Sequence, residues 1–207
     1  DYGFKNEYNI YLKNLITIGK NDSLYKSSPQ MEVMSIFELN TSLPMINQTE
    51  KNINYLTPKA SFRINPGDMK DYASSDRSIN VDGIFDINRL AIDDSFEEGK
   101  SLTLGLEYKK AKLNDINKFF EAKIATVYRD KNEKFIPVSS VISGKDTNVF
   151  GTISNNISKF VNVSYDFILD NDLSTLKYNS LDTSINFKNF NTSFKFIEED
   201  GAIGDTN

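Results

Sequence analysis

Four carboxylates stand close together near the middle of the chain, at Asp93-Asp94 and Glu97-Glu98. Hard cations such as Ca²⁺ bind clustered carboxylates, and paired carboxylates can also cleave glycosidic bonds. The spacing and the central glycine of an EF-hand loop are missing, and nothing else in the sequence supports a sugar-cleaving site. We therefore predict a solvated acidic loop that holds neither a metal nor another cofactor.

The residue types on which most enzymes rely are missing. The chain of 207 residues contains no histidine and no cysteine, which removes the commonest general base, the usual serine triad and any thiolate metal site. Gly99 and Gly105 are isolated, so the chain has no glycine-rich phosphate loop. The net charge of −5, with lysines scattered among acidic residues, argues against a nucleic-acid partner. We predict that the protein is not an enzyme.

Asn88 and Arg89 lie just before the acidic residues. A buried arginine needs a carboxylate partner, and Asp93 or Asp94 is close enough in the sequence to provide one. The pair therefore predicts a clamp that folds an ordered loop against the wall of a sheet.

Segments with a period of two surround this loop. In residues 102–108 the leucines and a tyrosine point one way, while Ser101, Thr103 and Glu107 point the other. The same pattern predicts ten strands, at residues 4–18, 31–43, 56–64, 79–85, 102–108, 120–129, 149–153, 161–169, 183–187 and 190–196. We expect loops over residues 47–54 and most of 68–100, and a hairpin turn at Asn155-Asn156. With no predicted helix, strands joined by tight turns form an antiparallel all-β meander.

The meander has one apolar and one polar face, a pattern that two fold classes share. In a soluble sandwich the apolar face packs into a core, whereas in a transmembrane barrel it contacts lipid. Residues 4–18 and 161–169 are longer than the roughly five or six residues usual in globular proteins. No apolar run approaches the roughly 18–20 residues of a membrane-spanning helix. Strand length thus favours the barrel, with the sandwich as the alternative.

The sequence around the acidic loop is similar to a family signature. Its members are Phe85, Asn88-Arg89, Asp94, Glu97 and Gly99, followed by residues 104–108. This run resembles the barrel of the LptD family of lipopolysaccharide-assembly proteins, also called organic solvent tolerance proteins. Further similarity follows in the family's order, at residues 55–66, 137–151, 165–170 and 189–194. Ile92 stands where the family often has glycine, and Ser95 stands where arginine is common.

The resemblance implies a partial outer-membrane β-barrel domain over residues 1–207. The chain starts without an initiator methionine or an export signal, and it ends in a polar tail. We therefore expect an internal fragment that lacks the signal peptide, the N-terminal periplasmic domain and the C-terminal end of the barrel. Its sheet would be open and would form part of a large transmembrane barrel.

By the same resemblance, the whole protein transports lipopolysaccharide and inserts it into the outer leaflet of the cell outer membrane of a Gram-negative bacterium. Its partners would be lipopolysaccharide, outer-membrane lipid, a plug lipoprotein similar to LptE and a periplasmic bridge protein similar to LptA. The alternatives are a different outer-membrane channel or receptor and a soluble secreted β-sandwich that acts as a binding module.

The resemblance also implies roles for two sets of residues. The motif loop would be either structural, or a luminal surface for the plug or the passing glycolipid; its residues are Asn88, Arg89, Asp94, Glu97 and Gly99. The side chains expected to face lipid share the apolar side of two strands. They are Leu102, Leu104, Leu106 and Tyr108, with Val161, Val163, Tyr165, Phe167 and Leu169.

Overall fold

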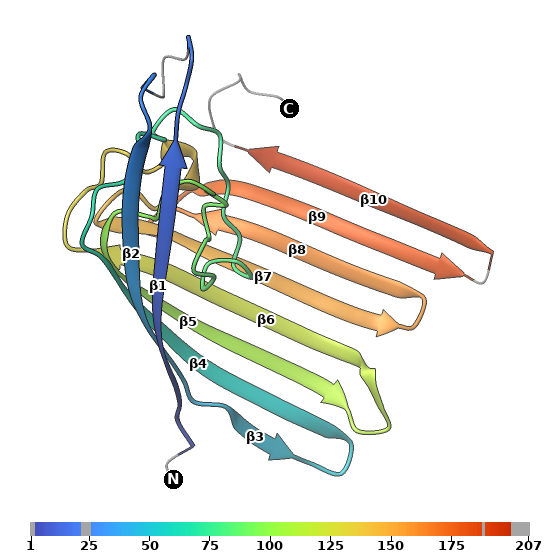
Figure 1. Cartoon of the computed structure of the whole chain (residues 1–207). Helices are drawn as coiled ribbons and strands as arrows, with labels where there is room; N and C mark the ends of the chain where they lie inside the picture. Colours follow the sequence, from blue (N-terminus) through green and yellow to red (C-terminus); the bar gives the residue numbers. More distant parts are fainter. Residues whose placement is uncertain (1–2, 22–25, 188, 200–207) are drawn as a thin grey trace.

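Ten strands form a single antiparallel sheet in the computed structural model, which describes residues 3–21, 26–187 and 189–199 (Figure 1). The strands are β1 (Lys5–Thr17), β2 (Gln30–Ser42), β3 (Met45–Gln48), β4 (Asn52–Asn65), β5 (Gly99–Lys112), β6 (Asp115–Arg129), β7 (Asp146–Ser158), β8 (Val161–Leu169), β9 (Leu176–Phe187) and β10 (Phe190–Glu199). A short 3₁₀ turn, Val138–Ser140, lies between β6 and β7. Within the described ranges, no helix has the length and apolar character to cross a membrane.

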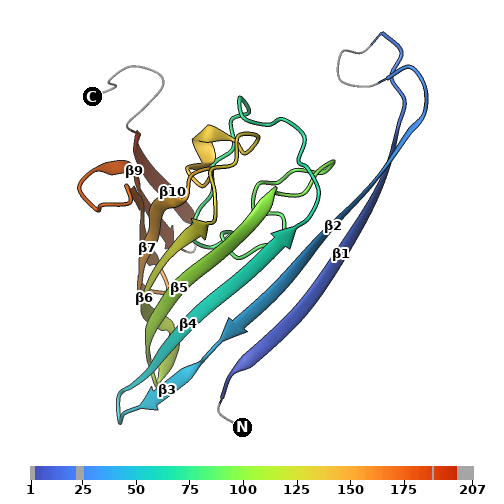
Figure 2. The same cartoon turned by 90° about the vertical axis from the view of Figure 1, so that its left-hand side faces the viewer.

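The sheet is a meander in which nearly every strand pairs with its neighbours in the chain. The order is β1-β2-β4-β5-β6-β7-β8-β9-β10, and β3 pairs with residues 53–56 of β4. The sheet is curved and has one concave side, with β1 and β10 at its two edges (Figures 1 and 2). The structure thus confirms the all-β, open antiparallel meander that the alternation predicts.

One predicted strand is wrong. Residues 79–85 contain no strand, and residues 81–85 form turns, because Ile79, Val81 and Ile84 are all buried in one loop core instead of alternating between two faces. Apolar residues at short spacing therefore mimic a strand here.

Long-range pairing also overrides two predicted breaks. Residues 47–54 contain the end of β3 and the start of β4 instead of a loop, and β3 and β4 pair with each other. β7 continues through Asn155-Asn156 to Ser158, and the chain turns at Lys159-Phe160. In both places hydrogen-bonded pairing with neighbouring strands outweighs the local preference of these residues for a turn. The turn-forming residues therefore lie inside a strand or directly beside one.

The two ends of the sheet differ in their connections. At one end, here called the turn end, Leu113-Asn114 joins β5 to β6 and Lys159-Phe160 joins β7 to β8. At the other, the loop end, β4 is joined to β5 by the first loop (residues 66–98), and β6 is joined to β7 by the second loop (residues 130–145). Short turns at one end and long loops at the other are also the pattern of outer-membrane barrels, in which the turns are periplasmic and the loops extracellular.

The strand register assigns the apolar side chains to one face of the sheet. Residues directly opposite one another in neighbouring strands point to the same side, so Leu106, Ile124 and Phe167 share a face, here called the outer face. Its other apolar side chains include Tyr8, Ile10, Phe37, Phe62, Leu102, Leu104, Tyr108, Ile153, Val161, Val163, Tyr165, Leu169, Leu181, Phe194 and Phe196. The two strands singled out from the sequence therefore present their apolar residues on the same face.

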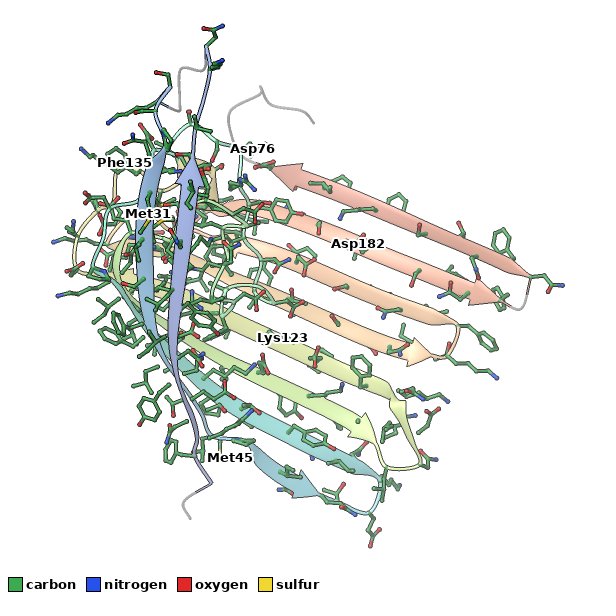
Figure 3. The ribbon with its side chains drawn as sticks, viewed as in Figure 1. Met31, Met45, Asp76, Lys123, Phe135 and Asp182 are labelled. Atoms are coloured by element: carbon green, nitrogen blue, oxygen red, sulfur yellow. The ribbon has the colours of Figure 1, made fainter. Side chains whose placement is uncertain are left out.

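The opposite, inner face is polar where the loops leave it open. Its side chains there include Lys59, Glu107, Lys109, Glu121, Lys123, Thr152, Ser154, Ser164, Asp166, Asp182 and Lys195. Many are paired with each other: Lys59 Nζ lies 2.5 Å from Glu107 Oε1, and Ser154 Oγ lies 3.1 Å from Ser164 Oγ. Figure 3 shows Lys123 and Asp182 on this part of the sheet.

Near the loop end, the first and second loops fold onto the inner face and bury a shared apolar core (Figure 2). The core consists of Met69, Ile79, Val81, Ile84, Leu90 and Ile92 from the first loop, Ile136 and Ile142 from the second, and Ala125, Val127 and Phe150 from the sheet. The first loop is therefore a packed element, although its sequence is mostly polar. Its close packing is clearest at Gly105, where an added Cβ would lie 2.7 Å from the ring of Phe85.

Candidate functional site

Arg89 lies at the centre of a buried polar cluster between the first loop and the sheet. Its side chain is 0% exposed. Its Nε donates a hydrogen bond to Glu97 Oε2 at 2.6 Å, and its Nη2 donates to Glu97 Oε1, which makes a two-point ion pair. The same guanidinium also donates to Thr103 Oγ1 at 2.8 Å and to Ser101 Oγ at 3.1 Å, both on the inner face of β5. Arg89 thus fastens the first loop to β5.

Glu97 joins a second arginine to the first. Arg129, at the end of β6, donates from Nη2 to the same Glu97 Oε1, and its Nε donates to the backbone oxygen of Ile142 in the second loop at 2.6 Å. Burial alone would raise the pKa of Glu97, but the charges of Arg89 and Arg129 outweigh it and hold that pKa well below its usual range. The ionised Glu97 therefore links both loops to the sheet.

A further ion pair extends the cluster across the sheet. Arg63 Nε donates to Glu38 Oε1 at 2.8 Å, and these side chains are 2% and 3% exposed. Arg63 Nη2 also donates to the backbone oxygen of Phe85 in the first loop at 2.5 Å. The register explains the arrangement, since Glu38 lies opposite Arg63, Arg63 opposite Ser101, and Ser101 opposite Arg129, in one row across β2, β4, β5 and β6.

We call these five residues the anchor cluster; they are Glu38, Arg63, Arg89, Glu97 and Arg129. Buried charges are tolerated when they are paired and hydrogen-bonded, and each member has a partner of opposite charge. The cluster contains no nucleophile and is closed to solvent. Its geometry is suited to holding the first and second loops in place on the inner face of the sheet.

The predicted partner of Arg89 is wrong. Asp94 instead accepts hydrogen bonds from Lys70 Nζ at 3.0 Å and from the Tyr72 hydroxyl, and Asp93 is exposed. The Arg89 side chain is directed at the inner face of β5, and Glu97, two residues before that strand, is the carboxylate on this side. Proximity in the sequence favours Asp93 or Asp94 as the partner of Arg89, but the direction in which the loop runs brings Glu97 to Arg89 instead.

Asn88 shapes the loop locally and does not join the anchor cluster. It is exposed, and its side-chain oxygen accepts a hydrogen bond from the backbone N–H of Ile92 at 2.9 Å. Ile92 and Ser95, the two departures from the family pattern, are both buried, the first in the loop core. No group of three or more acidic side chains in the described part of the chain is arranged to hold a metal ion.

Gly99, the last residue of the motif, occupies a position that excludes a side chain. Its φ is +79°, a region that other residues rarely adopt, and an added Cβ would lie 1.9 Å from Glu133 Oε1. Glu133 belongs to the second loop, and its side chain is 2% exposed. The start of β5 is thus in contact with the second loop at a point where any side chain would strain the backbone and require Glu133 to move.

Replacing Gly99 with alanine is expected to destabilise the packing of the two loops by about 1–3 kcal/mol, because the backbone is strained and Glu133 has to move. The measurement is equilibrium unfolding in phospholipid vesicles. Gly144→Ala is the matched control, since its added Cβ would come no closer than 3.5 Å to another heavy atom. Equal stability of the two variants would contradict this account of Gly99.

Sequence reasoning missed four charged residues of the site: Glu38, Arg63, Arg129 and Glu133. Glu38, Arg63 and Arg129 are buried because the two loops cover this part of the sheet, and Glu133 is buried because its own loop packs against the start of β5. One signal was available, because Arg63 and Arg129 both lie near the loop end of a predicted strand, on its polar side. An arginine there, next to a loop that contains its own acidic residues, is a candidate for such an anchor.

Comparison with known proteins identifies the family. The family model described as LptD, LPS transport system D, matches residues 8–202. No curated protein matches the chain. The matched range includes β2 to β10, both loops and the whole anchor cluster. The chain therefore belongs to the LptD family, which serves lipopolysaccharide transport in the outer membrane.

Proposed function

We propose that residues 1–207 form part of the wall of an outer-membrane barrel that inserts lipopolysaccharide into the outer leaflet. The separation of the two faces carries this proposal, because the register puts apolar side chains on the outer face and charged and hydroxyl side chains on the inner face. A lipid-facing exterior and a wet interior require this separation. The outer face is uncovered in the described structure, as shown by Leu102, Leu104 and Leu106, which are 37%, 40% and 40% exposed.

The outer-face residues of β5 and β8 are then the lipid contacts. They are Leu102, Leu104, Leu106, Tyr108, Val161, Val163, Tyr165, Phe167 and Leu169. A soluble sandwich would cover this face with a second sheet, whereas the described residues form one sheet. A different channel or receptor shares the alternation but does not account for the family match.

The transport step is physical in this proposal. The polar inner face accommodates the sugar part of the glycolipid, and the acyl chains leave sideways into the membrane where two strands part. The first and second loops occupy the interior near the loop end, which places them at the extracellular side if the short turns are periplasmic. A plug lipoprotein similar to LptE and a bridge protein similar to LptA are the partners that the family resemblance suggests.

The motif loop has a structural role in this proposal. Arg89 and Glu97 are buried in the anchor cluster, with side chains 0% and 6% exposed, and Gly99 allows the second loop to pack closely. Asp94 and Asn88 stabilise the fold of the first loop itself. A direct contact of Arg89 with the plug or the glycolipid would require the loop to open.

The two faces can be tested with single tryptophans, because the chain has none of its own. Tyr165 and Ser164 are neighbours in β8 at one depth, the first on the outer and the second on the inner face. Phosphatidylcholine with brominated acyl chains is expected to quench the tryptophan of Tyr165→Trp, and an aqueous quencher that of Ser164→Trp. Reversed or equal accessibility would overturn the assignment of the faces.

Photo-cross-linking tests the passage of the glycolipid. A photoreactive residue in place of Ser164 is expected to capture lipopolysaccharide in growing cells, with the sugar part at the attachment point. The same residue in place of Tyr165 is expected to capture phospholipid. Absence of lipopolysaccharide at Ser164 would contradict the proposed path along the inner face, while leaving the orientation of the wall to the quenching result.

A further inference from the structure

A basic hollow of about 260 Å³ lies on the outer face, at the turn end of the sheet. It is lined by Asn52, Lys110, Lys112, Lys118, Phe119, Phe120, Asn155, Asn156 and Ile157. The register assigns most of these residues to the outer face, since Lys112 lies opposite Asn52, Lys110 opposite Phe120, and Phe120 opposite Asn155. Four strands, β4, β5, β6 and β7, thus build one site at the edge of the apolar surface.

Its charges strongly favour an anion. Lys110 and Lys112 are exposed, and neither is within salt-bridge distance of a carboxylate in the described part of the chain. Lys118 Nζ lies 3.6 Å from Asp115 Oδ2, and Glu50 lines the adjoining hollow together with Lys51 and Lys112. The acidic residues Glu107 and Glu121 belong to the inner face. Lysines therefore outnumber carboxylates around the hollow, because Lys51 and the three lining lysines face Asp115 and Glu50.

The hollow also has an apolar side. Phe120 is 38% exposed and Ile157 is 57% exposed, and both line it. The next row of the outer face, toward the middle of the strands, contains Tyr108, Ile153 and Tyr165. A ligand that places a phosphate between the lysines would find an apolar surface beginning at the same point. A free phosphate would make no use of that surface.

We propose that this hollow binds the headgroup of an anionic phospholipid, with the phosphate between Lys110, Lys112 and Lys118 and the acyl chains along the outer face. The proposal rests on the lipid-facing orientation of that face put forward above. Asn52 and Asn155 also line the hollow, and a carboxamide can donate hydrogen bonds to phosphate or glycerol oxygens. Lysines and aromatic rings at the border of an apolar band match the composition of a membrane interface.

The site would belong to the leaflet that meets the short turns. Because outer-membrane barrels place their short turns on the periplasmic side, the ligand would be a phospholipid of the inner leaflet. Lipopolysaccharide in the outer leaflet would not reach this end of the strands. The hollow therefore fixes the depth of the wall in the membrane and does not take part in transport.

The experiment uses a tryptophan in place of Ile153, next to the hollow, and a second variant with a tryptophan in place of Leu102, toward the loop end. The protein is reconstituted in phosphatidylcholine with a small share of either brominated phosphatidylglycerol or brominated phosphatidylcholine. At Ile153→Trp, phosphatidylglycerol is expected to associate at least roughly fivefold more tightly than phosphatidylcholine, the effect of about one lysine at a membrane surface. At Leu102→Trp the two lipids are expected to be equivalent.

The lysines are tested by charge-matched variants. Lys110→Ala, Lys112→Ala and Lys118→Ala together are expected to abolish the preference at Ile153→Trp. The control removes three exposed lysines near the loop end, through Lys100→Ala, Lys134→Ala and Lys145→Ala, and is expected to keep it. A preference that survives the first triple variant, or is absent from the parent protein, overturns the proposal.

The outcomes separate this site from the proposed function. Quenching of both tryptophans without any preference for phosphatidylglycerol overturns the headgroup site and leaves the lipid-facing orientation intact. Quenching at neither position by either lipid overturns both, because the outer face would then not contact acyl chains.

Discussion

Replacing Glu97 with glutamine is expected to release both loops from the wall, at a cost of about 3–5 kcal/mol. Glutamine has nearly the same shape, but it removes the charge that Arg89 and Arg129 share. Both arginine side chains are 0% exposed, so neither can turn to water without opening a loop. The cost arises because two buried guanidinium groups lose their common counter-charge.

Two measurements test the Glu97→Gln variant. Unfolding in phospholipid vesicles gives the loss of free energy, and limited proteolysis shows whether cleavage begins in the first and second loops while the strands stay protected. Glu98→Gln is the matched control at the next position. Burial and the neighbouring Glu133 raise the pKa of Glu98, so removing its charge is expected to be neutral or slightly stabilising. Equal losses in both variants would sink the anchor role of Glu97.

The same cluster predicts a pH dependence. The pKa of Glu97 is lowered by the fold, so its stabilisation is fully present above the pKa of an unfolded glutamate, about 4.3. It is lost as the pH falls below that value toward the lower pKa of the folded state. The stability difference between the parent protein and Glu97→Gln is therefore expected to be constant near neutral pH and to shrink below about pH 4. A difference that does not change with acidification would contradict this coupling.

Placing lysine at Leu104 is expected to destabilise the membrane-embedded wall by about 2–4 kcal/mol. Leu104 lies near the middle of β5 on the outer face, where a charged side chain would meet the hydrocarbon region. The cost depends on depth and falls to about 0–1 kcal/mol near the interface. The measurement is equilibrium unfolding in phospholipid vesicles.

Leu113→Lys is the matched control for this variant. Leu113 lies in the turn between β5 and β6, and Leu104 and Leu113 are each 40% exposed. In a soluble protein the two substitutions would have similar small effects, because both side chains already contact solvent to the same extent. A large difference between the two losses of stability requires that Leu104 is surrounded by hydrocarbon and Leu113 is not. Near-equal effects would refute the lipid-facing assignment of β5.

The alternation of residues 102–108 and 161–169 was sufficient to predict β5 and β8, because side chains of a strand alternate whatever its neighbours are. The choice of faces followed as well, since each strand has one apolar side. The motif from Phe85 to Gly99 identified the family that the family model matches. These features are local, and each can be read from a short stretch of the chain.

The ends of strands and the fold of the loops could not be read in this way. Asn155-Asn156 has the composition of a turn, yet pairing with residues 119–120 of β6 and 162–163 of β8 keeps both residues in β7. Ile79, Val81 and Ile84 mimic a strand but belong to a core completed by Ile136 and Phe150, which lie far away in the sequence. Both errors have one cause, because the deciding contacts are made with residues that a short window does not include.

By itself, the sequence determined an all-β meander, the division into an apolar and a polar face, and membership of a lipopolysaccharide-transport family. The tertiary structure decided which charges meet. Arg89 pairs with Glu97 and not with the nearer Asp94, and Glu97 also receives Arg129 from β6. Side-chain alternation is a property of one strand, whereas an ion pair between elements depends on the register of several strands and on the direction in which a loop folds back.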